Sequence, residues 1–305
     1  MDERIKKTGK FAIAKGKFLL MLVGLLILVL LIKKVGLAQL MSIVNEMNPI
    51  YVLIAAVPWI FTMFAGAYRL KKLVSADINF FEIFKIYCYG FLLNYASPIQ
   101  GFGAGAKIAM LKMKKVKVSK SSASVGSEIG YDILFSLAVV MIFFVYHVDF
   151  LINQLKEVLN LNLIYIGLII LLMLIVAAGI LRKHKFVVEF FEHLIGSFKL
   201  NKMKKLLPVT LLMWVLPATV IYLLFIAAGS PISYWIALGS ICIGFIFGLA
   251  SFIPGGLGVR DAITAYVYSL SGVPLDMTIS IAIFNRFFTI GIVLLVVIFL
   301  KAYEK

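Results

Sequence analysis

Two short stretches of this chain interrupt otherwise apolar sequence with a proline and closely spaced glycines. The first spans residues 96–103 and contains Pro98 and Gly101, and the second spans residues 250–258 and contains Pro254. Proline removes a backbone donor and clashes with the preceding helical turn, and glycine readily adopts non-helical angles. A helix therefore cannot run straight through either stretch. Such matched interruptions in the two halves of a membrane protein indicate a transporter-type site near the middle of the bilayer, where protein or water covers the irregular backbone.

The composition is that of a membrane protein, because 63% of the 305 residues are apolar and the mean hydropathy is +1.06. Crossing the hydrocarbon core of a bilayer takes roughly 20 residues. A first helix is expected around Phe18–Ile32, where no small-residue cleavage site indicates a signal peptide. The other long apolar segments are Ile50–Tyr68, Leu163–Leu181, Leu207–Gly229, Tyr234–Pro254 and Met277–Leu300.

The net charge of +16 has a simpler explanation than nucleic-acid binding. Lys and Arg gather in four regions: the N-terminal arm, the segment after Tyr68, residues 101–127 and residues 182–205. Positive residues of membrane proteins concentrate in cytoplasmic loops and contact anionic lipid headgroups. We therefore expect a multi-pass protein of the cell membrane with both termini in the cytoplasm. Its expected partner is membrane lipid, and we expect no binding of nucleic acid.

The charge pattern also predicts how the two interrupted segments are arranged. The basic clusters Arg69–Lys72 and Lys107–Lys120 both have the character of cytoplasmic loops, so the segment between them is not expected to cross the membrane. A re-entrant hairpin resolves the conflict: residues 80–97 enter the membrane, the chain turns at residues 98–103, and residues 104–114 return. By the same logic residues 234–251 enter, the chain turns at residues 254–258, and residues 262–271 return as the second hairpin. The prediction is an all-α polytopic membrane protein with six crossings and two re-entrant hairpins. Eight simple crossings are the alternative, which places one basic loop outside.

Three crossings and one hairpin in each half make the second half inverted relative to the first. The chain is accordingly predicted to be one integral membrane domain over residues 1–305, with pseudo-repeats over 1–150 and 160–305. Pro98 and Pro254 mark the two hairpin turns.

Charged residues inside the apolar segments form the candidate polar network. Glu128 and Asp132 open the crossing that runs to about Val145, and their spacing of four places them on one helix face. Arg286 lies at a comparable point of the last crossing. Buried charges are costly unless they are paired or reach water. We therefore hypothesise that Arg286 faces Glu128 or Asp132 across the pseudo-symmetry axis.

Arg260 and Asp261 directly follow the second glycine turn. A cation beside free backbone N–H groups at the start of a half-helix suits an anionic group such as a lipid phosphate. The alternative is that the two residues merely cap the returning half-helix and pair locally. Lys107 follows the first turn in a similar way.

Enzymatic chemistry finds little support in the sequence. Cys88 and Cys242 lie in apolar segments without a partner at metal-ligand spacing, and the three histidines show no such spacing either. No Gly-x4-Gly-Lys-Ser/Thr motif for ATP occurs. We therefore expect no metal, no cofactor and no enzymatic activity.

The segment Pro254–Asp261 resembles the P-G-G-L-G signature of the flippase-like proteins, the transmembrane-region family of lysylphosphatidylglycerol synthetase. Further residues fit the upstream pattern of this family: Asn94, Pro98, Gly101, Ser119, Glu128 and Asp132. Three positions depart from it: Gln100 stands where arginine is common, Ile129 replaces the arginine after the glutamate, and Asp261 replaces a glutamate.

The resemblance covers nearly the whole chain and implies the flippase-like region without the soluble aminoacyltransferase domain of the bifunctional synthetases. It implies transport of an anionic phospholipid or a lipid-linked glycan. The expected headgroup site comprises Arg260, Lys107, Asn94, Gly101, Gly256 and Gly258, and the expected buried charge network comprises Glu128, Asp132, Asp261 and Arg286. Three alternatives stay open: a membrane-embedded lipid-modifying transferase, a non-transporting subunit of a lipid synthase, and a carrier of small solutes. A homo-oligomer or a complex with a lipid synthase is also possible.

Overall fold

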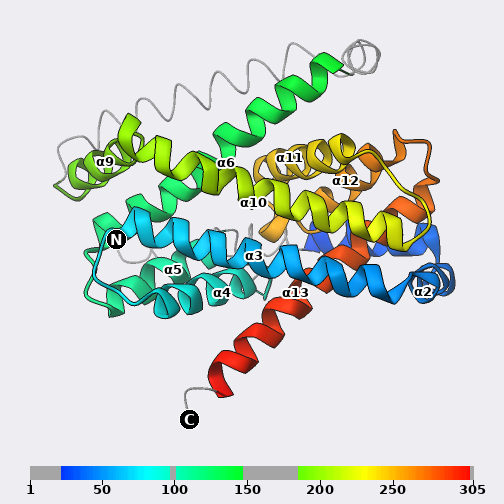
Figure 1. Ribbon diagram of the computed structural model, residues 1–305, viewed down its shortest axis with the longest axis horizontal. Coiled ribbons are helices and arrows are strands. Elements are labelled where there is room, and N and C mark those ends of the chain that lie inside the picture. The colour runs from blue at the N-terminus through cyan, green and yellow to red at the C-terminus, as the bar shows by residue number, and fades with distance from the viewer. Residues whose placement is uncertain (1–21, 97–100, 147–184, 303–305) are drawn as a thin grey trace, which may run out of the picture.

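A computed structural model describes residues 22–96, 101–146 and 185–302, and this part of the chain is helical without strands (Figure 1). Its first helix is Leu22–Val35. The helices that follow are α2 (Leu37–Glu46), α3 (Pro49–Val74), α4 (Phe80–Ala96), α5 (Phe102–Met113), α6 (Val118–Tyr146), α9 (Lys185–Ser197), α10 (Leu200–Ala227), α11 (Tyr234–Ala250), the 3-10 turn η1 (Pro254–Gly256), α12 (Val259–Ser269) and α13 (Leu275–Ala302).

Four of these helices, α3, α6, α10 and α13, are long and apolar enough to cross a membrane. Helix Leu22–Val35 and α2 form a fifth candidate span with a bend of 75°, located at Gly36, whose φ is 85°. The prediction of an all-α polytopic membrane protein is confirmed. The crossing predicted at Leu163–Leu181 lies outside the described residues.

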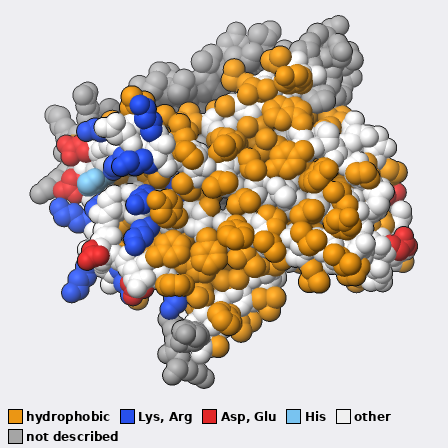
Figure 2. All heavy atoms as spheres, in the orientation of Figure 1, with side chains coloured by type: hydrophobic (Ala, Val, Ile, Leu, Met, Phe, Trp, Pro, Cys, Tyr) orange, Lys and Arg blue, Asp and Glu red, His pale blue; other side chains and the backbone are white. Residues whose placement is uncertain are grey.

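The surface of the long helices is apolar, as a lipid-facing surface must be. Large side chains such as Leu53 and Phe61 of α3 and Leu295 and Phe299 of α13 are exposed. Figure 2 shows hydrophobic side chains spread over the visible face, with Lys and Arg gathered at one end of the long axis. At that end α3 and α5 finish and α6 and α10 begin, so the basic residues lie together in space although they are far apart in the sequence.

Helices α4 and α5 form an antiparallel pair that is too short to span a bilayer. Their 17 and 12 residues give lengths of about 26 and 18 Å at 1.5 Å per residue, against about 30 Å of hydrocarbon. Contacts between Asn94 and Gly103, and between Tyr87 and Lys107, show that the two helices run in opposite directions. The predicted turn at Pro98 lies outside the described residues, and α5 begins after Gly101, whose φ is 74°.

Helices α11 and α12 form the second short antiparallel pair, with 17 and 11 residues. Their turn depends on glycine, because the φ angles of Gly255, Gly256 and Gly258 are 59°, 62° and 73°. Helix α12 begins at Val259 rather than at the predicted residue 262. The earlier start has a local cause, because Asp261 Oδ2 accepts a hydrogen bond of 3.0 Å from the Gly258 backbone N–H.

The turns of the two pairs meet in the interior of the molecule. Gly255 lies against the backbone of Asn94 and the ring of Tyr95, and Figure 1 shows the pairs approaching from opposite ends. The packing partners within α3–α6 recur within α10–α13: the first helix of each series contacts the second, the second contacts the third, and the third contacts the fourth. Between the series, α6 packs on α11 and α13 packs on α4. An inverted repeat requires this correspondence between the two series of helices. That the two halves form an inverted repeat stays a prediction.

Candidate functional site

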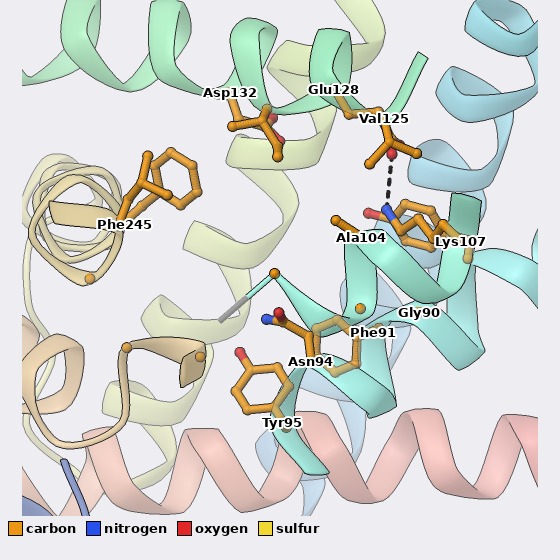
Figure 3. Close-up of a pocket in the computed structure, with 18 of the residues that line it drawn as sticks. Gly90, Phe91, Asn94, Tyr95, Ala104, Lys107, Val125, Glu128, Asp132 and Phe245 are labelled. Atoms are coloured by element: carbon orange, nitrogen blue, oxygen red, sulfur yellow. Dashed lines mark hydrogen bonds and ion pairs between the residues drawn. The ribbon is translucent and has the colours of Figure 1, made fainter. Parts of the chain in front are cut away.

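A cavity of about 340 Å³ lies between the turns of the two helical pairs (Figure 3). Residues of α3, α4, α5, α6, α11, η1 and α12 line it. Seven of the residues predicted from the sequence are among them: Asn94, Gly101, Lys107, Glu128, Asp132, Gly256 and Arg260. The structure thus brings together residues that are up to 166 positions apart because both interrupted segments end at the same place.

Lys107 and Glu128 form an ion pair at one wall of this cavity. Lys107 Nζ lies 2.9 Å from Glu128 Oε2, and the two side chains are 16% and 4% exposed. The ammonium group also lies 4.4 Å from the centre of the Tyr87 ring, where the negative face of the ring stabilises it. Glu128 Oε1 is buried without a hydrogen-bond partner among the described residues, so this carboxylate keeps an unused acceptor.

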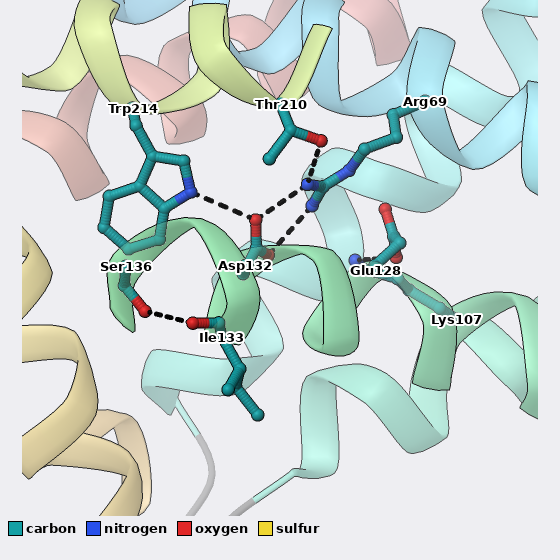
Figure 4. Close-up of polar contacts among 8 residues, drawn as sticks. All are labelled: Arg69, Lys107, Glu128, Asp132, Ile133, Ser136, Thr210 and Trp214. Atoms are coloured by element: carbon teal, nitrogen blue, oxygen red, sulfur yellow. Dashed lines mark hydrogen bonds and ion pairs between the residues drawn. The ribbon is translucent and has the colours of Figure 1, made fainter. Parts of the chain in front are cut away.

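Arg69 and Asp132 form a second, bidentate ion pair (Figure 4). Arg69 Nη1 and Nη2 donate to the two Asp132 oxygens at 2.7 and 2.8 Å. Thr210 Oγ1 accepts a further bond of 3.3 Å from Nη1, and Trp214 Nε1 donates to Asp132 Oδ1 at 3.3 Å. The Arg69 side chain is 1% exposed, so its charge lies in the protein interior.

The expectation that Arg69 belongs to a cytoplasmic loop is wrong. It lies inside α3, which continues to Val74. The two lysines that follow it gave the segment a loop-like character. The spacing of residues in α3 could have indicated this placement. Arg69 stands three residues after Gly66 and four before Leu73, so it lies on the same face of the helix as these two buried residues. The start of α6 was also misplaced: this helix begins ten residues before Glu128, which therefore sits within the helix and not at its entrance.

The hypothesis that Arg286 faces Glu128 or Asp132 is wrong as well. Arg286 pairs with Asp261, with Nε 2.9 Å from Oδ1 and Nη2 2.8 Å from Oδ2. Both side chains are buried, at 6% and 7% exposure. The cause is that α13 packs directly on α12, so that Asp261 is nearer than either carboxylate of α6. The predicted network is therefore three separate ion pairs, and this pair does not line the large cavity.

Arg260 differs from these cations because no described residue is its counter-ion. Its side chain is half-buried, and among the described residues it has no ion pair or side-chain hydrogen bond. Asp261 caps α12, as the alternative predicted, but its ion-pair partner is Arg286 of α13, and no described residue forms an ion pair with Arg260. In the described part of the cavity, three cations and two carboxylates give one unit of excess positive charge, and Arg260 supplies it.

The glycines near the turns have two different surroundings. A Cβ on Gly103 would lie 2.2 Å from the Gly90 carbonyl oxygen, so this glycine allows α4 and α5 to pack closely. A Cβ on Gly101 would meet no described atom within 4 Å. Gly258 lies outside the cavity and packs against Gly24 and Ile27 of the first helix. Close packing on the first helix requires a glycine at this position.

Residues 14–297 match the family described as the lysylphosphatidylglycerol synthase TM region. The chain belongs to this family. The resemblance seen in the second glycine turn therefore extends over almost the whole sequence.

Two relatives place the family match in context. A phosphatidylglycerol lysyltransferase of Staphylococcus haemolyticus is 25% identical over 244 aligned residues, and the match covers 77% of this chain and 27% of that protein. The chain thus spans about a quarter of the length of that relative. A UPF0104 membrane protein of Methanothermobacter thermautotrophicus is 23% identical over 303 residues, covering 88% of this chain and 89% of its own.

Metal binding has no support in the part of the family domain that the structure describes. No group of three or more His, Cys, Asp or Glu residues there is arranged to hold a metal ion. Cys88 and Cys242 are buried, free thiols, and their apolar surroundings give them the role of small core residues. The cations that line the large cavity are Lys107, Arg69 and Arg260.

Proposed function

We propose that this protein moves an anionic phospholipid or a lipid-linked glycan across the cell membrane. The observation that supports the proposal is an unpaired arginine in a cavity built by both interrupted segments. Arg260 has no carboxylate partner among the described residues, whereas Lys107, Arg69 and Arg286 each have one. A cation without a counter-ion is costly at membrane depth. The partner that Arg260 lacks is therefore a mobile anion.

The charge of the cavity matches the charge of a lipid phosphodiester. The described residues of the cavity carry one excess positive charge, and a phosphodiester carries one negative charge. The Asn94 amide, which also lines the cavity, offers hydrogen bonds to a headgroup. The exposed apolar surface of the long helices suits the acyl chains, which can stay in the bilayer while the headgroup enters the protein.

The proposed orientation follows from the basic end of the molecule. We infer that this end faces the cytoplasm, since positive residues favour that side. The pair α4 and α5 then enters from the cytoplasm and the pair α11 and α12 from outside, as the inverted repeats 1–150 and 160–305 require. Both termini are cytoplasmic in this arrangement.

The test is a lipid-movement assay in reconstituted vesicles. Purified protein is inserted into vesicles that contain fluorescent phosphatidylglycerol, and a membrane-impermeant quencher reports movement between the leaflets. We expect Arg260→Gln to slow the movement at least tenfold, which corresponds to about 1.4 kcal/mol. The matched control is Lys112→Gln, because Lys112 is an exposed cation on α5 that does not line the cavity. Its rate is expected to equal that of the wild type.

The same preparation separates the proposal from its rivals. Equal rates for the wild type and Arg260→Gln would remove Arg260 from the mechanism. A wild-type protein that moves no lipid but forms a new product from radiolabelled lipid would be a transferase. Co-purification with a lipid synthase, without movement, would indicate a non-transporting subunit.

A further inference from the structure

The Arg69 guanidinium uses only part of its hydrogen-bonding capacity. A guanidinium carries five N–H donors in a rigid plane. Nη1 donates to Asp132 and Thr210, and Nη2 donates to Asp132. Nε is buried without a hydrogen-bond partner among the described residues. The Nε–H group and the second Nη2–H group lie on the same edge of the plane, so Arg69 keeps an edge that can hold a second carboxylate through two parallel hydrogen bonds.

Glu128 is the carboxylate placed to use this edge. Glu128 and Asp132 are four residues apart in α6 and therefore share a helix face. Figure 4 shows one Glu128 oxygen directed toward Arg69, and the two side chains interact electrostatically. Glu128 Oε1 and Arg69 Nε are both buried without a partner in the described part of the chain. Because buried polar atoms are almost always paired, this matched acceptor and donor indicate a contact that belongs to another state of the site.

Lys107, the present partner of Glu128, is the cation of this group that a ligand can reach. Its side chain is 16% exposed and lines the cavity, whereas Arg69 is 1% exposed. A phosphate that binds Lys107 competes with Glu128 for the ammonium group. Glu128 is 4% exposed, so the loss of its cation would leave a buried charge unpaired, which is costly. The unused edge of Arg69 removes this cost.

We propose that Arg69 is a positioning residue that receives the Glu128 carboxylate when a headgroup phosphate binds Lys107. Glu128 moves from the ammonium group to the Nε edge of Arg69, while Asp132 stays on the opposite edge with its two hydrogen bonds. Both carboxylates remain ionised, so no proton is taken up or released. When the headgroup leaves, Glu128 returns to Lys107. The exchange rests on the proposed function for the identity of the anion.

The first experiment tests the contact between Arg69 and Glu128 without any ligand. Lys107→Met leaves Glu128 dependent on Arg69, and Arg69→Lys keeps a cation for Asp132 but removes the second edge. The exchange predicts that the two changes together lower the unfolding temperature in detergent by more than the sum of their separate effects. Adding Glu128→Gln is expected to abolish this excess.

The control for this cycle is Lys112→Met, because Lys112 is an exposed lysine of α5 that does not line the cavity. Its effect is expected to add to that of Arg69→Lys. A purely structural role for Arg69 gives additive effects with Lys107→Met as well, and that result overturns the exchange.

The second experiment follows Glu128 itself and needs no Arg69 variant. Infrared difference spectra are recorded with and without short-chain phosphatidylglycerol for the wild type and Glu128→Gln. The exchange predicts that binding shifts the band of an ionised carboxylate in the wild type and that Glu128→Gln lacks this shift. Unchanged carboxylate bands overturn the exchange. A protonated carboxyl band that appears on binding and is absent in Glu128→Gln also overturns it, because Glu128 then takes up a proton.

The vesicle assay separates the exchange from the proposed function. Arg69→Lys is expected to slow lipid movement about tenfold, and adding Glu128→Gln is expected to restore part of the rate, because Lys107 no longer has to be released. Excess destabilisation in the first experiment with a wild type that moves no lipid rejects the proposed function and keeps the exchange. Additive effects with a wild type that does move lipid overturn the exchange and leave the proposed function standing.

Discussion

The helical pairs α4–α5 and α11–α12 each form an ion pair at the same place, but the positions of the cation and the carboxylate are exchanged. In each, the returning helix pairs with the long helix that follows it: Lys107 with Glu128 in the first and Asp261 with Arg286 in the second. The cation lies on the returning helix in the first pair and on the long helix in the second. The first lysine is 16% exposed, whereas both partners of the second are at most 7% exposed.

The contacts around the two ion pairs explain what this difference means. Asp261 also accepts a hydrogen bond from the Gly258 backbone, and Arg286 lies 5.3 Å from the Tyr95 ring. These contacts fix the second glycine turn. Glu128 instead leaves one oxygen unused, and Lys107 reaches the cavity. The second ion pair therefore supports the glycine turn, whereas we propose that the first exchanges its partner for a ligand.

The largest expected effect is on the second ion pair. Arg286→Leu leaves Asp261 as a buried charge without its cation, which is expected to lower the free energy of unfolding by about 3–5 kcal/mol. Thermal unfolding in detergent measures the loss. Adding Asp261→Asn to Arg286→Leu removes the stranded charge and is expected to restore most of the stability. An unfolding temperature of Arg286→Leu equal to that of the wild type would contradict a structural role for the pair.

The first ion pair is expected to affect movement more than stability. Lys107→Met strands the Glu128 carboxylate beside a cavity that admits water, so we expect a loss of about 1–3 kcal/mol. The double variant Lys107→Met, Glu128→Gln is expected to recover the stability but not the rate of lipid movement, because the cation for the headgroup is still missing. Recovery of both quantities would assign the first pair the same structural role as the second and would remove the contrast.

The glycines of the two pairs are expected to affect stability through packing and not through charge. Gly103→Ala places a Cβ 2.2 Å from the Gly90 carbonyl oxygen, and this overpacking is expected to cost about 1–3 kcal/mol. Gly244→Ala meets the Thr264 methyl group at 2.5 Å, and a side chain can shift more easily than backbone, so a smaller loss is expected.

Gly105→Ala serves as the control for both glycine variants. No described atom lies within 4 Å of its Cβ, and alanine in a helix is favoured by about 0.5–1 kcal/mol. Unfolding temperatures measured side by side give the ranking. Equal losses at Gly103 and Gly244 would show that the two pairs are packed with the same tolerance.

The sequence predicted the interrupted segments well because their chemistry is local. Proline and glycine limit the backbone angles wherever the rest of the protein lies. Helices α4 and α11 accordingly end within one residue of the predicted positions at Ser97 and Ser251. The location of Arg260 and Lys107 beside a common cavity followed from the same two turns.

The partners of the buried charges were not predictable in the same way. Which carboxylate an arginine meets depends on how each helix is rotated and which helix packs beside it. Spacing along the sequence gave Arg286 a counterpart on α6, but the packing of α13 on α12 brought Asp261 closer. Arg69 was misplaced for a different reason. The lysines that follow it made the segment resemble a loop, although Arg69 lies on the buried face of α3.

Gly258 has a consequence for how the chain is assembled. Helix Leu22–Val35 comes from the beginning of the chain, yet Gly24 and Ile27 press against Gly258 in the other half. A cut in the segment between α6 and α9 would thus yield two fragments that depend on each other. The N-terminal fragment would cover the second glycine turn, which belongs to the C-terminal fragment. Neither fragment alone keeps that loop covered, so co-expression, and not separate refolding, is the route to a functional split protein.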